Sequence, residues 1–205
     1  MNKTQEQSLH PDYSLIKNLV ENNSTVLDLG CGEGNLLKLL IEEKNVKGKG
    51  IEINQDKIIQ CIHNGLSVIQ GDIDEGLADF SDEEIDYVIL NQTLQSVQKP
   101  DYVINEMLRV GKKAIVSFPN FAYWRIRLYL LLHGKMPKSK RLPFEWYDTP
   151  NIHLLTVRDF FDFCEKRNIK ISNSILIRRG KVINSMFKRV FADIFAEEVL
   201  FVIHK

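Results

Sequence analysis

The feature that most constrains the fold is an alternation of apolar runs of strand length with stretches of helical periodicity. The strand-like runs lie at 24–30, 46–53, 66–72, 85–92 and 113–119, and the helical stretches at 34–44, 54–64 and 101–110. Repeated β-α-β order predicts a parallel sheet with helices on both faces, because strands buried on both sides are apolar almost throughout. The pattern therefore indicates a Rossmann-like α/β fold.

This rhythm breaks after the fifth apolar run. Residues 120–153 predict a helix that ends at Gly134, followed by a basic, proline-containing loop, which we interpret as an insertion over the working edge of the sheet. A further helix is expected at 156–168, where Thr156 is a suitable N-cap. Two more strands are predicted at 169–177 and 197–205. Together these elements predict a central, mostly parallel, seven-stranded sheet.

Composition limits the broad class of the protein. The chain has 205 residues, of which 44% are hydrophobic, and we expect a single domain over 1–205. Lys plus Arg and Asp plus Glu both number 27, so no overall charge favours nucleic acid or an anionic membrane as a partner. Without a long apolar stretch or a signal peptide pattern, a cytoplasmic protein is expected. Cys31, Cys61 and Cys164 are widely spaced, which predicts neither a disulfide framework nor a metal site.

The stretch "VLDLGCGEG" at 26–34 is a strand that ends in a glycine-rich turn and opens into a helix. Glycines let a ligand approach the backbone closely, and the helix N-terminus offers free N–H groups to an anion. The dinucleotide fingerprint G-x-G-x-x-G is incomplete, because Asn35 stands at its third glycine and Gly34 comes one residue early. An NAD-dependent oxidoreductase is therefore disfavoured. A tight turn that binds no ligand is the simpler alternative.

Acidic residues at strand ends indicate an adenosyl ligand. Asp28 suits an ammonium group better than a pyrophosphate, and S-adenosylmethionine carries an ammonium, a carboxylate and a sulfonium that acids favour. Glu52 ends the second strand, where an acid accepts ribose hydroxyls in either kind of cofactor. Asp72 is positioned to accept from the adenine amino group with Ile73 over the ring, or else it is a simple turn former.

The fourth strand is followed by Asn91 and Gln92, where an open sheet places its ligand crevice. The [N/D]-P-P-[F/Y] signature of base-methylating enzymes is absent, since the sequence reads Asn91-Gln92-Thr93-Leu94. Methylation of a nucleic-acid base is therefore disfavoured.

The "DLGCGEG" loop, the acid in "GIEI", the Asp of "QGDID" and the segment "EMLRVGKKAIVSFPN" together resemble the class I S-adenosylmethionine-dependent methyltransferases. The stretches "WYDTPNIH" and "FAEEVLFVI" are more specific, and they resemble the MetW family of methionine-biosynthesis proteins. This resemblance extends from about Tyr13 to the end of the chain.

The resemblance implies the methyltransferase fold, a site for S-adenosylmethionine or S-adenosylhomocysteine, and an accessory role beside the homoserine O-acyltransferase MetX. The expected cofactor-binding residues are Asp28, Gly30, Cys31, Gly32, Glu52, Ile53, Asp72, Ile73 and Asn91. An authentic methyltransferase that acts on a small molecule is the alternative.

The insertion supplies most of the remaining candidates. As residues of a substrate pocket or lid we consider Gln92, Asn120, Trp124, Trp146, Tyr147, Asp148, Asn151 and His153. His153 or Asp148 would suit a general base, whereas a polar loop held by its own hydrogen bonds explains them equally well. The helix with Trp124 and Tyr129 is either a solvated face or a surface that docks a partner through aromatic and arginine side chains. No catalytic residue and no metal ligand is assigned.

Overall fold

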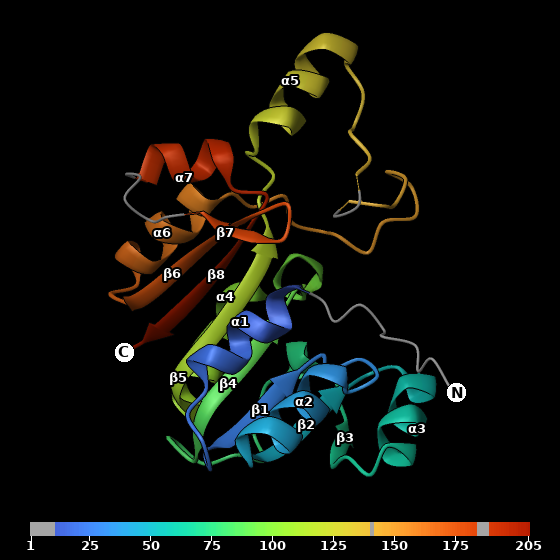
Figure 1. The fold of residues 1–205 in the computed structure, drawn as a ribbon, viewed down its shortest axis with the longest axis vertical. Helices are drawn as coiled ribbons and strands as arrows, with labels where there is room; N and C mark the ends of the chain where they lie inside the picture. Colours follow the sequence, from blue (N-terminus) through green and yellow to red (C-terminus); the bar gives the residue numbers. More distant parts are fainter. Residues whose placement is uncertain (1–10, 140–141, 184–188) are drawn as a thin grey trace, which may run out of the picture.

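The computed structural model describes residues 11–139, 142–183 and 189–205 (Figure 1). Its centre is an eight-stranded sheet with the order β3-β2-β1-β4-β5-β8-β6-β7. The strands are β1 Thr25–Leu29, β2 Lys47–Glu52, β3 Val68–Gln70, β4 Ile85–Asn91, β5 Gly111–Pro119, β6 Lys170–Arg178, β7 Lys181–Ile183 and β8 Glu198–His204. The helices are α1 Pro11–Leu19, α2 Asn35–Lys44, α3 Gln55–His63, α4 Pro100–Val110, α5 Trp124–His133, α6 Val157–Lys166 and α7 Arg189–Phe195.

Strands β1 to β5 are parallel to one another, and β8 is antiparallel to both β5 and β6. This arrangement confirms the predicted α/β class and the mostly parallel sheet. From β1 the chain first adds strands on one side and then, with β4, on the other, so the strand order reverses between β1 and β4. A ligand crevice is expected at the carboxyl ends of the strands beside such a reversal.

The strand count differs from the expected seven by one. The additional strand, β7, has three residues and pairs with β6 across a turn in which Arg179 and Gly180 have φ of 51° and 72°. Two positive φ values are typical of tight hairpin turns. The sequence pattern missed β7 because it is too short for a recognisable periodicity, and it also left α1 and α7 unassigned.

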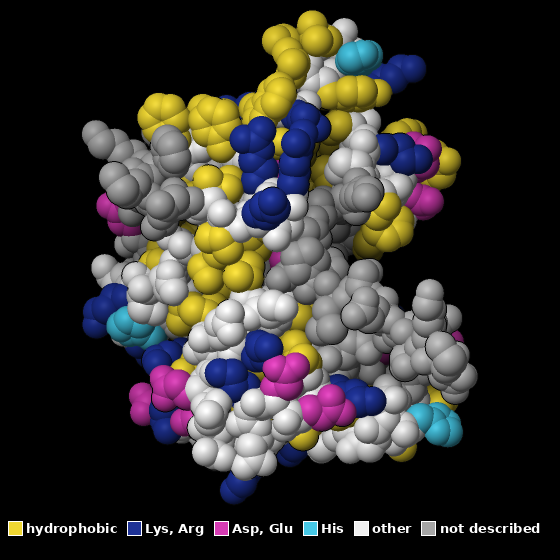
Figure 2. Space-filling model, viewed as in Figure 1, with side chains coloured by type: hydrophobic (Ala, Val, Ile, Leu, Met, Phe, Trp, Pro, Cys, Tyr) yellow, Lys and Arg dark blue, Asp and Glu magenta, His cyan; other side chains and the backbone are white. Residues whose placement is uncertain are grey.

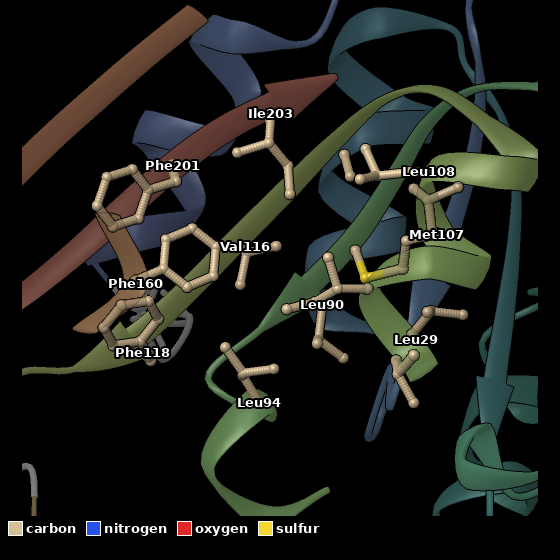
Figure 3. Packing of buried hydrophobic residues seen from close by; sticks show 14 of the residues in the cluster. Leu29, Leu90, Leu94, Met107, Leu108, Val116, Phe118, Phe160, Phe201 and Ile203 are labelled. Atoms are coloured by element: carbon tan, nitrogen blue, oxygen red, sulfur yellow. The ribbon is translucent and has the colours of Figure 1, made fainter. Parts of the chain in front are cut away.

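Helices cover the two faces of the sheet in separate layers. Residues of α1 and α2 pack with one face in a cluster that includes Ile16 and Leu37, and residues of α4, α6 and α7 pack on the other. On this second face Phe118, Phe160 and Phe201 gather at one end of the core (Figure 3), with ring centroids of Phe160 and Phe201 4.6 Å apart. Burial of these rings contributes strongly to stability, since each aromatic side chain removes a large apolar area from water.

Helix α5 extends away from the sheet and, with the irregular segment that follows it, forms the upper part of the view in Figure 1. None of its residues is buried. Its first turn is attached to the body by Arg127, which donates to the carbonyl of Ala122 at 2.5 Å and to the Asp193 carboxylate at 2.6 Å. The helix therefore forms where the sequence predicts it, but it contributes little to the core.

Helix α6 begins with a complete capping box, which confirms Thr156 as its N-cap. The Thr156 hydroxyl accepts from the Asp159 N–H at 3.1 Å, and the Asp159 carboxylate accepts from the Thr156 N–H at 3.0 Å. Two N–H groups that the helix itself cannot satisfy thereby gain partners.

We therefore expect Thr156→Ala to lower the free energy of unfolding by about 1 kcal/mol, because a capping hydroxyl is lost. Urea denaturation measures this change. Thr156→Ser retains the hydroxyl and serves as the matched control. Equal stability of the alanine variant and the unsubstituted protein would contradict a stabilising cap.

Candidate functional site

The glycine turn after β1 has the open backbone that its sequence predicts. Gly30, Gly32 and Gly34 have φ of 68°, 58° and 79°, a region that glycine adopts at no steric cost. The N–H groups of Gly30 and Cys31 both donate to the carbonyl of Ile51, at 2.8 and 3.1 Å, which fixes the turn against β2. A Cβ added to Gly32 would meet no atom within 4 Å, so space is left above this backbone.

Glu52 holds the turn from the end of β2. Its Oε2 accepts from the Gly32 N–H at 2.8 Å, and its Oε1 accepts from the N–H groups of Ile53 and Asn54 at 3.0 and 2.9 Å. The side chain is buried. A carboxylate offers about four lone-pair sites, so Oε2 retains capacity for one further donor such as a ribose hydroxyl. Ile53, which follows it, is 62% exposed.

Asp28 is 3% exposed and accepts no hydrogen bond from any residue that the structure describes. Burial, followed by the negative charge of Glu52, raises its pKa to about 7. A buried carboxylate without a partner is costly in its charged form, and a cation beside it would remove that cost. The predicted ammonium acceptor thus lies in an environment that favours a positively charged ligand group.

The N-terminal turn of α1 adds acidic groups that the sequence analysis missed. Asp12 is fully buried, and the pKa of Tyr13 is raised by burial and by the nearby charges of Asp28, Asp12 and Glu33. These side chains therefore lie close to the glycine turn. The sequence around Asp12 and Tyr13 does not indicate that they lie near the glycine turn, because only the packing of α1 against the sheet brings them there.

The end of β4 lies next to the end of β1, on the side away from β2. The Asn91 side chain accepts from the Ser117 hydroxyl at 2.5 Å, and the Gln92 amide donates to Asp12 at 3.2 Å and to the Ser117 hydroxyl at 3.4 Å. Gln92 has a φ of 53°, which is uncommon for a residue other than glycine. Asn91 and Gln92 therefore lie at the crevice, held by Ser117 of β5, a neighbour that spacing along the chain does not reveal.

Asp72 and Ile73 lie after β3, next to the end of β2, since the Gly71 N–H donates to the Glu52 carbonyl at 3.1 Å. The Asp72 Oδ1 accepts from the Asp74 N–H at 2.9 Å and caps a short 3-10 helix, η1, Ile73–Glu75. Asp72 is thus a turn former, as the simpler interpretation expects, and its Oδ2 has no hydrogen bond to a described residue. A role toward an adenine remains a prediction.

Cys31 lies within the turn, yet its thiol is not a reactive group. It is buried, and burial is the largest of the effects that raise its pKa. Because the thiolate is the nucleophilic form, such a cysteine is inert at neutral pH. Cys61 of α3 packs beneath it, and its thiol donates to the carbonyl of Gly32 at 3.2 Å.

One part of the insertion reaches the crevice. The N–H groups of Ile152 and His153 donate to the backbone carbonyl of Gln95, at 2.8 and 3.0 Å, in the short 3-10 helix η2, Leu94–Ser96, which follows β4. The Gln95 amide in turn donates to the Gln92 carbonyl at 2.6 Å. The Nε2 atom of His153 is buried without a hydrogen-bond partner among the described residues. His153 and Ile152 are therefore held next to the segment that follows β4.

Other insertion candidates lie apart from the glycine turn. Trp146 is 76% exposed and lines, with Tyr129 and Phe144, a cavity of about 570 Å³ between α5 and the loop after it. Tyr147 is exposed and packs edge to face on Trp146, and Asp148 accepts from the Glu145 N–H at 2.8 Å.

Asn151, Trp124 and Asn120 have local contacts of their own. The Asn151 N–H donates to the Thr149 hydroxyl at 3.1 Å, and the Trp124 ring lies against Tyr123 with its Nε1 buried and without a partner in the described chain. Asn120 is fully buried, and its amide donates to the carbonyls of residues 193 and 196 at 2.7 and 2.9 Å. These hydrogen bonds satisfy the buried amide of Asn120 and give the residue a structural role.

The turn is thus held by hydrogen bonds and has acidic side chains near it. Carboxylates from α1, β1, the glycine turn and β2 act on one another or on Tyr13, and the N–H groups at the start of α2, which no side chain caps, favour an anion. Among the described residues, no group of three or more His, Cys, Asp or Glu side chains is arranged to hold a metal ion. A ligand that carries both a cation and a carboxylate fits this pattern of charges.

Comparisons with known proteins bear on the family and the fold. The family model described as "Methionine biosynthesis protein MetW" matches residues 10–203. The bifunctional methionine biosynthesis protein MetXA/MetW of Rhodopirellula baltica is 38% identical over 177 residues, which cover 82% of this chain and 28% of that protein. The chain thus corresponds to about a quarter of its curated relative.

Solved structures share the fold at low identity. A TehB-like S-adenosylmethionine-dependent methyltransferase from Corynebacterium glutamicum superposes with a TM-score of 0.62 at 14% identity, covering 96% of this chain and 88% of that one. An S-adenosylmethionine-dependent methyltransferase from Aquifex aeolicus gives a TM-score of 0.61 at 14% identity, with 94% and 88% covered. These matches confirm the predicted methyltransferase-like fold.

The raised pKa of Asp28 predicts how stability depends on pH. Between about pH 4 and pH 7 the folded state binds the Asp28 proton more tightly than the unfolded state, so the stability falls as the pH rises. Asp28→Asn removes this penalty, and we expect the variant to be more stable at pH 8 by up to about 4 kcal/mol and by less at pH 5. Urea denaturation at the two pH values measures the difference.

Asp79→Asn removes the charge of an exposed aspartate and is the control, for which no such gain is expected. A loss of stability at pH 8 in Asp28→Asn would show that the carboxylate has a stabilising partner.

Proposed function

This chain belongs to the MetW family of methionine biosynthesis proteins, and from that premise we propose that it binds S-adenosylmethionine or S-adenosylhomocysteine and assists a homoserine O-acyltransferase. The observation that carries the ligand proposal is the buried Asp28, which has no hydrogen-bond partner in the described part of the chain, beside an open glycine turn. A buried acid in this position favours a ligand with a positive charge. S-adenosylmethionine has two such groups, its ammonium and its sulfonium.

The residues at the crevice fit an adenosyl amino acid. Asp28 would accept from the ammonium, the N–H groups at the start of α2 would hold the carboxylate, and Glu52 Oε2 would accept from a ribose hydroxyl. Asp72 and Ile73, next to the end of β2, would face the base. When bound as S-adenosylmethionine, the ligand supplies an electrophilic methyl group. The residues of this chain bind and orient the ligand and give it an acidic environment.

The accessory role is supported by the relative from Rhodopirellula baltica, whose name joins MetXA and MetW in one bifunctional chain. Two proteins that are joined in one chain in one organism are good candidates for partners where they are separate. On this proposal the bound ligand regulates the partnership only if it binds one state of the complex more tightly than the other.

A second candidate is methyl transfer to a small molecule. It is favoured by His153, whose unpartnered Nε2 lies in the segment bound to η2 beside the end of β4. Such a side chain would suit an acceptor that has to lose a proton. Acceptor-dependent release of S-adenosylhomocysteine that disappears in His153→Gln would establish this activity, and its absence would leave the accessory role as the better explanation.

The ligand proposal predicts a thermal shift. At a concentration of about 100 times Kd, S-adenosylmethionine or S-adenosylhomocysteine should stabilise the native state by roughly 2.7 kcal/mol and raise Tm by about 5 to 10 °C. Asp28→Ala and Glu52→Gln should each reduce the shift, since they weaken the ammonium and ribose contacts. Glu42→Gln, at an exposed position on α2, is the matched control. NAD should produce no shift. An equal shift with NAD, or none with the adenosyl ligands, would contradict the proposal.

The accessory role predicts a complex and a change in rate. Purified homoserine O-acyltransferase from the same organism should be retained by this chain in a pull-down, and its kcat/KM should rise when the chain is added. We expect an unrelated methyltransferase of the same fold to have neither effect, because fold alone carries no partner specificity. Absence of both the complex and the rate change would refute the accessory role.

A further inference from the structure

Helix α5 has an apolar surface that nothing in the described chain covers. Leu131 and Leu132 are 81% and 68% exposed, and Leu128, Tyr129 and Leu130 are also exposed. In Figure 2 hydrophobic side chains gather at the top of the view, where Figure 1 places α5, with Lys and Arg side chains beside them. Contiguous apolar surface of this kind is rare on monomeric soluble proteins and marks interaction sites.

The distribution of apolar residues around α5 distinguishes a protein partner from a membrane surface. A helix that lies on a bilayer has one apolar face and a charged opposite face. From Leu128 to Leu132 every residue of α5 is apolar or aromatic, so apolar groups surround the helix over more than one turn. A helix that is apolar on all sides is normally buried within protein or spans a membrane, and α5, with 10 residues, is too short to span. This pattern favours insertion into a groove of another protein.

The loop after α5 extends the same surface. Met136, Phe144 and Trp146 line, with Tyr129 of the helix, the cavity of about 570 Å³, and the first two of these side chains are each about half exposed. Aromatic residues and methionine in such a position are typical of the centre of protein interfaces. The helix and the loop together therefore present both a ridge and a hollow to a partner.

Charge restricts the choice of partner. Residues 124–154 contain six Lys and Arg against two Asp and Glu. In the described part of this segment Lys138 pairs with Glu145, whereas Arg125 and Lys135 have no acidic partner among the described residues. Two copies of this chain meeting through α5 would bring like charges together, which disfavours self-association. The complementary surface is apolar at its centre and acidic around it.

We propose that α5 and the described parts of the loop after it, 134–139 and 142–146, form the docking surface for the homoserine O-acyltransferase. On this proposal α5 inserts into an apolar groove of that enzyme, and carboxylates border the groove. This inference rests on the proposed accessory function and adds the surface that performs it. It accounts for the exposure of α5, for the excess of cations beside it and for the joined relative, in which the two parts share one chain.

The test is a titration of purified homoserine O-acyltransferase from the same organism with the full chain and its variants. Leu131→Asp places a charge at the most exposed apolar position of α5 and should weaken Kd at least about tenfold, as expected for a central interface residue. Ile62→Asp makes the same change at an exposed position on α3, beside β3 at the far end of the sheet, and should leave Kd unchanged. Thermal melting checks that both variants are folded.

The charge requirement is tested separately. Arg125→Glu combined with Lys135→Glu should slow association and reduce its dependence on salt, because rim charges act mainly on the association rate. Lys57→Glu on α3 is the control. Association that is unchanged in the double variant would refute the acidic partner surface.

The outcomes separate the two proposals. If the unsubstituted chain binds the acyltransferase and Leu131→Asp binds it equally well, the accessory function stands and the docking surface is wrong. If the unsubstituted chain does not bind, both the accessory function and this occupant are refuted. Dimerisation of the chain alone that Leu131→Asp abolishes, or binding of α5 to anionic lipid vesicles without binding to the enzyme, would likewise overturn the proposal.

Discussion

The candidate site depends on one buried carboxylate. Glu52 accepts three backbone N–H groups, one from the glycine turn and two from the start of the segment that leads into α3. Hydrogen bonds to a charged acceptor are stronger than those to a neutral one, and here they compensate the removal of Glu52 from water. Because the two loops are bound to the same side chain, the spacing between the ends of β1 and β2 is fixed before any ligand arrives.

The burial of Asp28, on the neighbouring strand β1, is not compensated in this way. Asp28 is equally buried but receives none of the N–H groups that satisfy Glu52, and the charge of Glu52 adds to its cost. The oxygens of Glu52 therefore have little capacity left to accept further hydrogen bonds, whereas those of Asp28 are fully available to a ligand. A cationic group that enters the crevice therefore gains most beside Asp28.

The alternation of apolar runs and helical stretches was sufficient to predict the order of the principal elements, because strands buried on both faces leave a strong local signal. The same holds for Thr156, whose capping role depends on residues only three positions apart. Contacts between residues far apart in the sequence were not predictable. Gln92 donates to Asp12, which is 80 residues away, and α1 contains no motif that indicates its position in the fold. The hydrogen bond from the Asn120 amide to the backbone of α7 was likewise not predictable, because the pattern does not reveal α7.

The exposure of α5 also has a consequence for how such a protein is made in a cell. An exposed apolar stretch such as 128–132 is an aggregation hazard, so on the proposed docking, copies synthesised in excess over the partner would be at risk. Equal synthesis of the two partners removes that excess. A bifunctional chain such as the relative in Rhodopirellula baltica sets the ratio at one to one by translation itself. If the two proteins are separate chains, the proposed docking requires that their synthesis be matched.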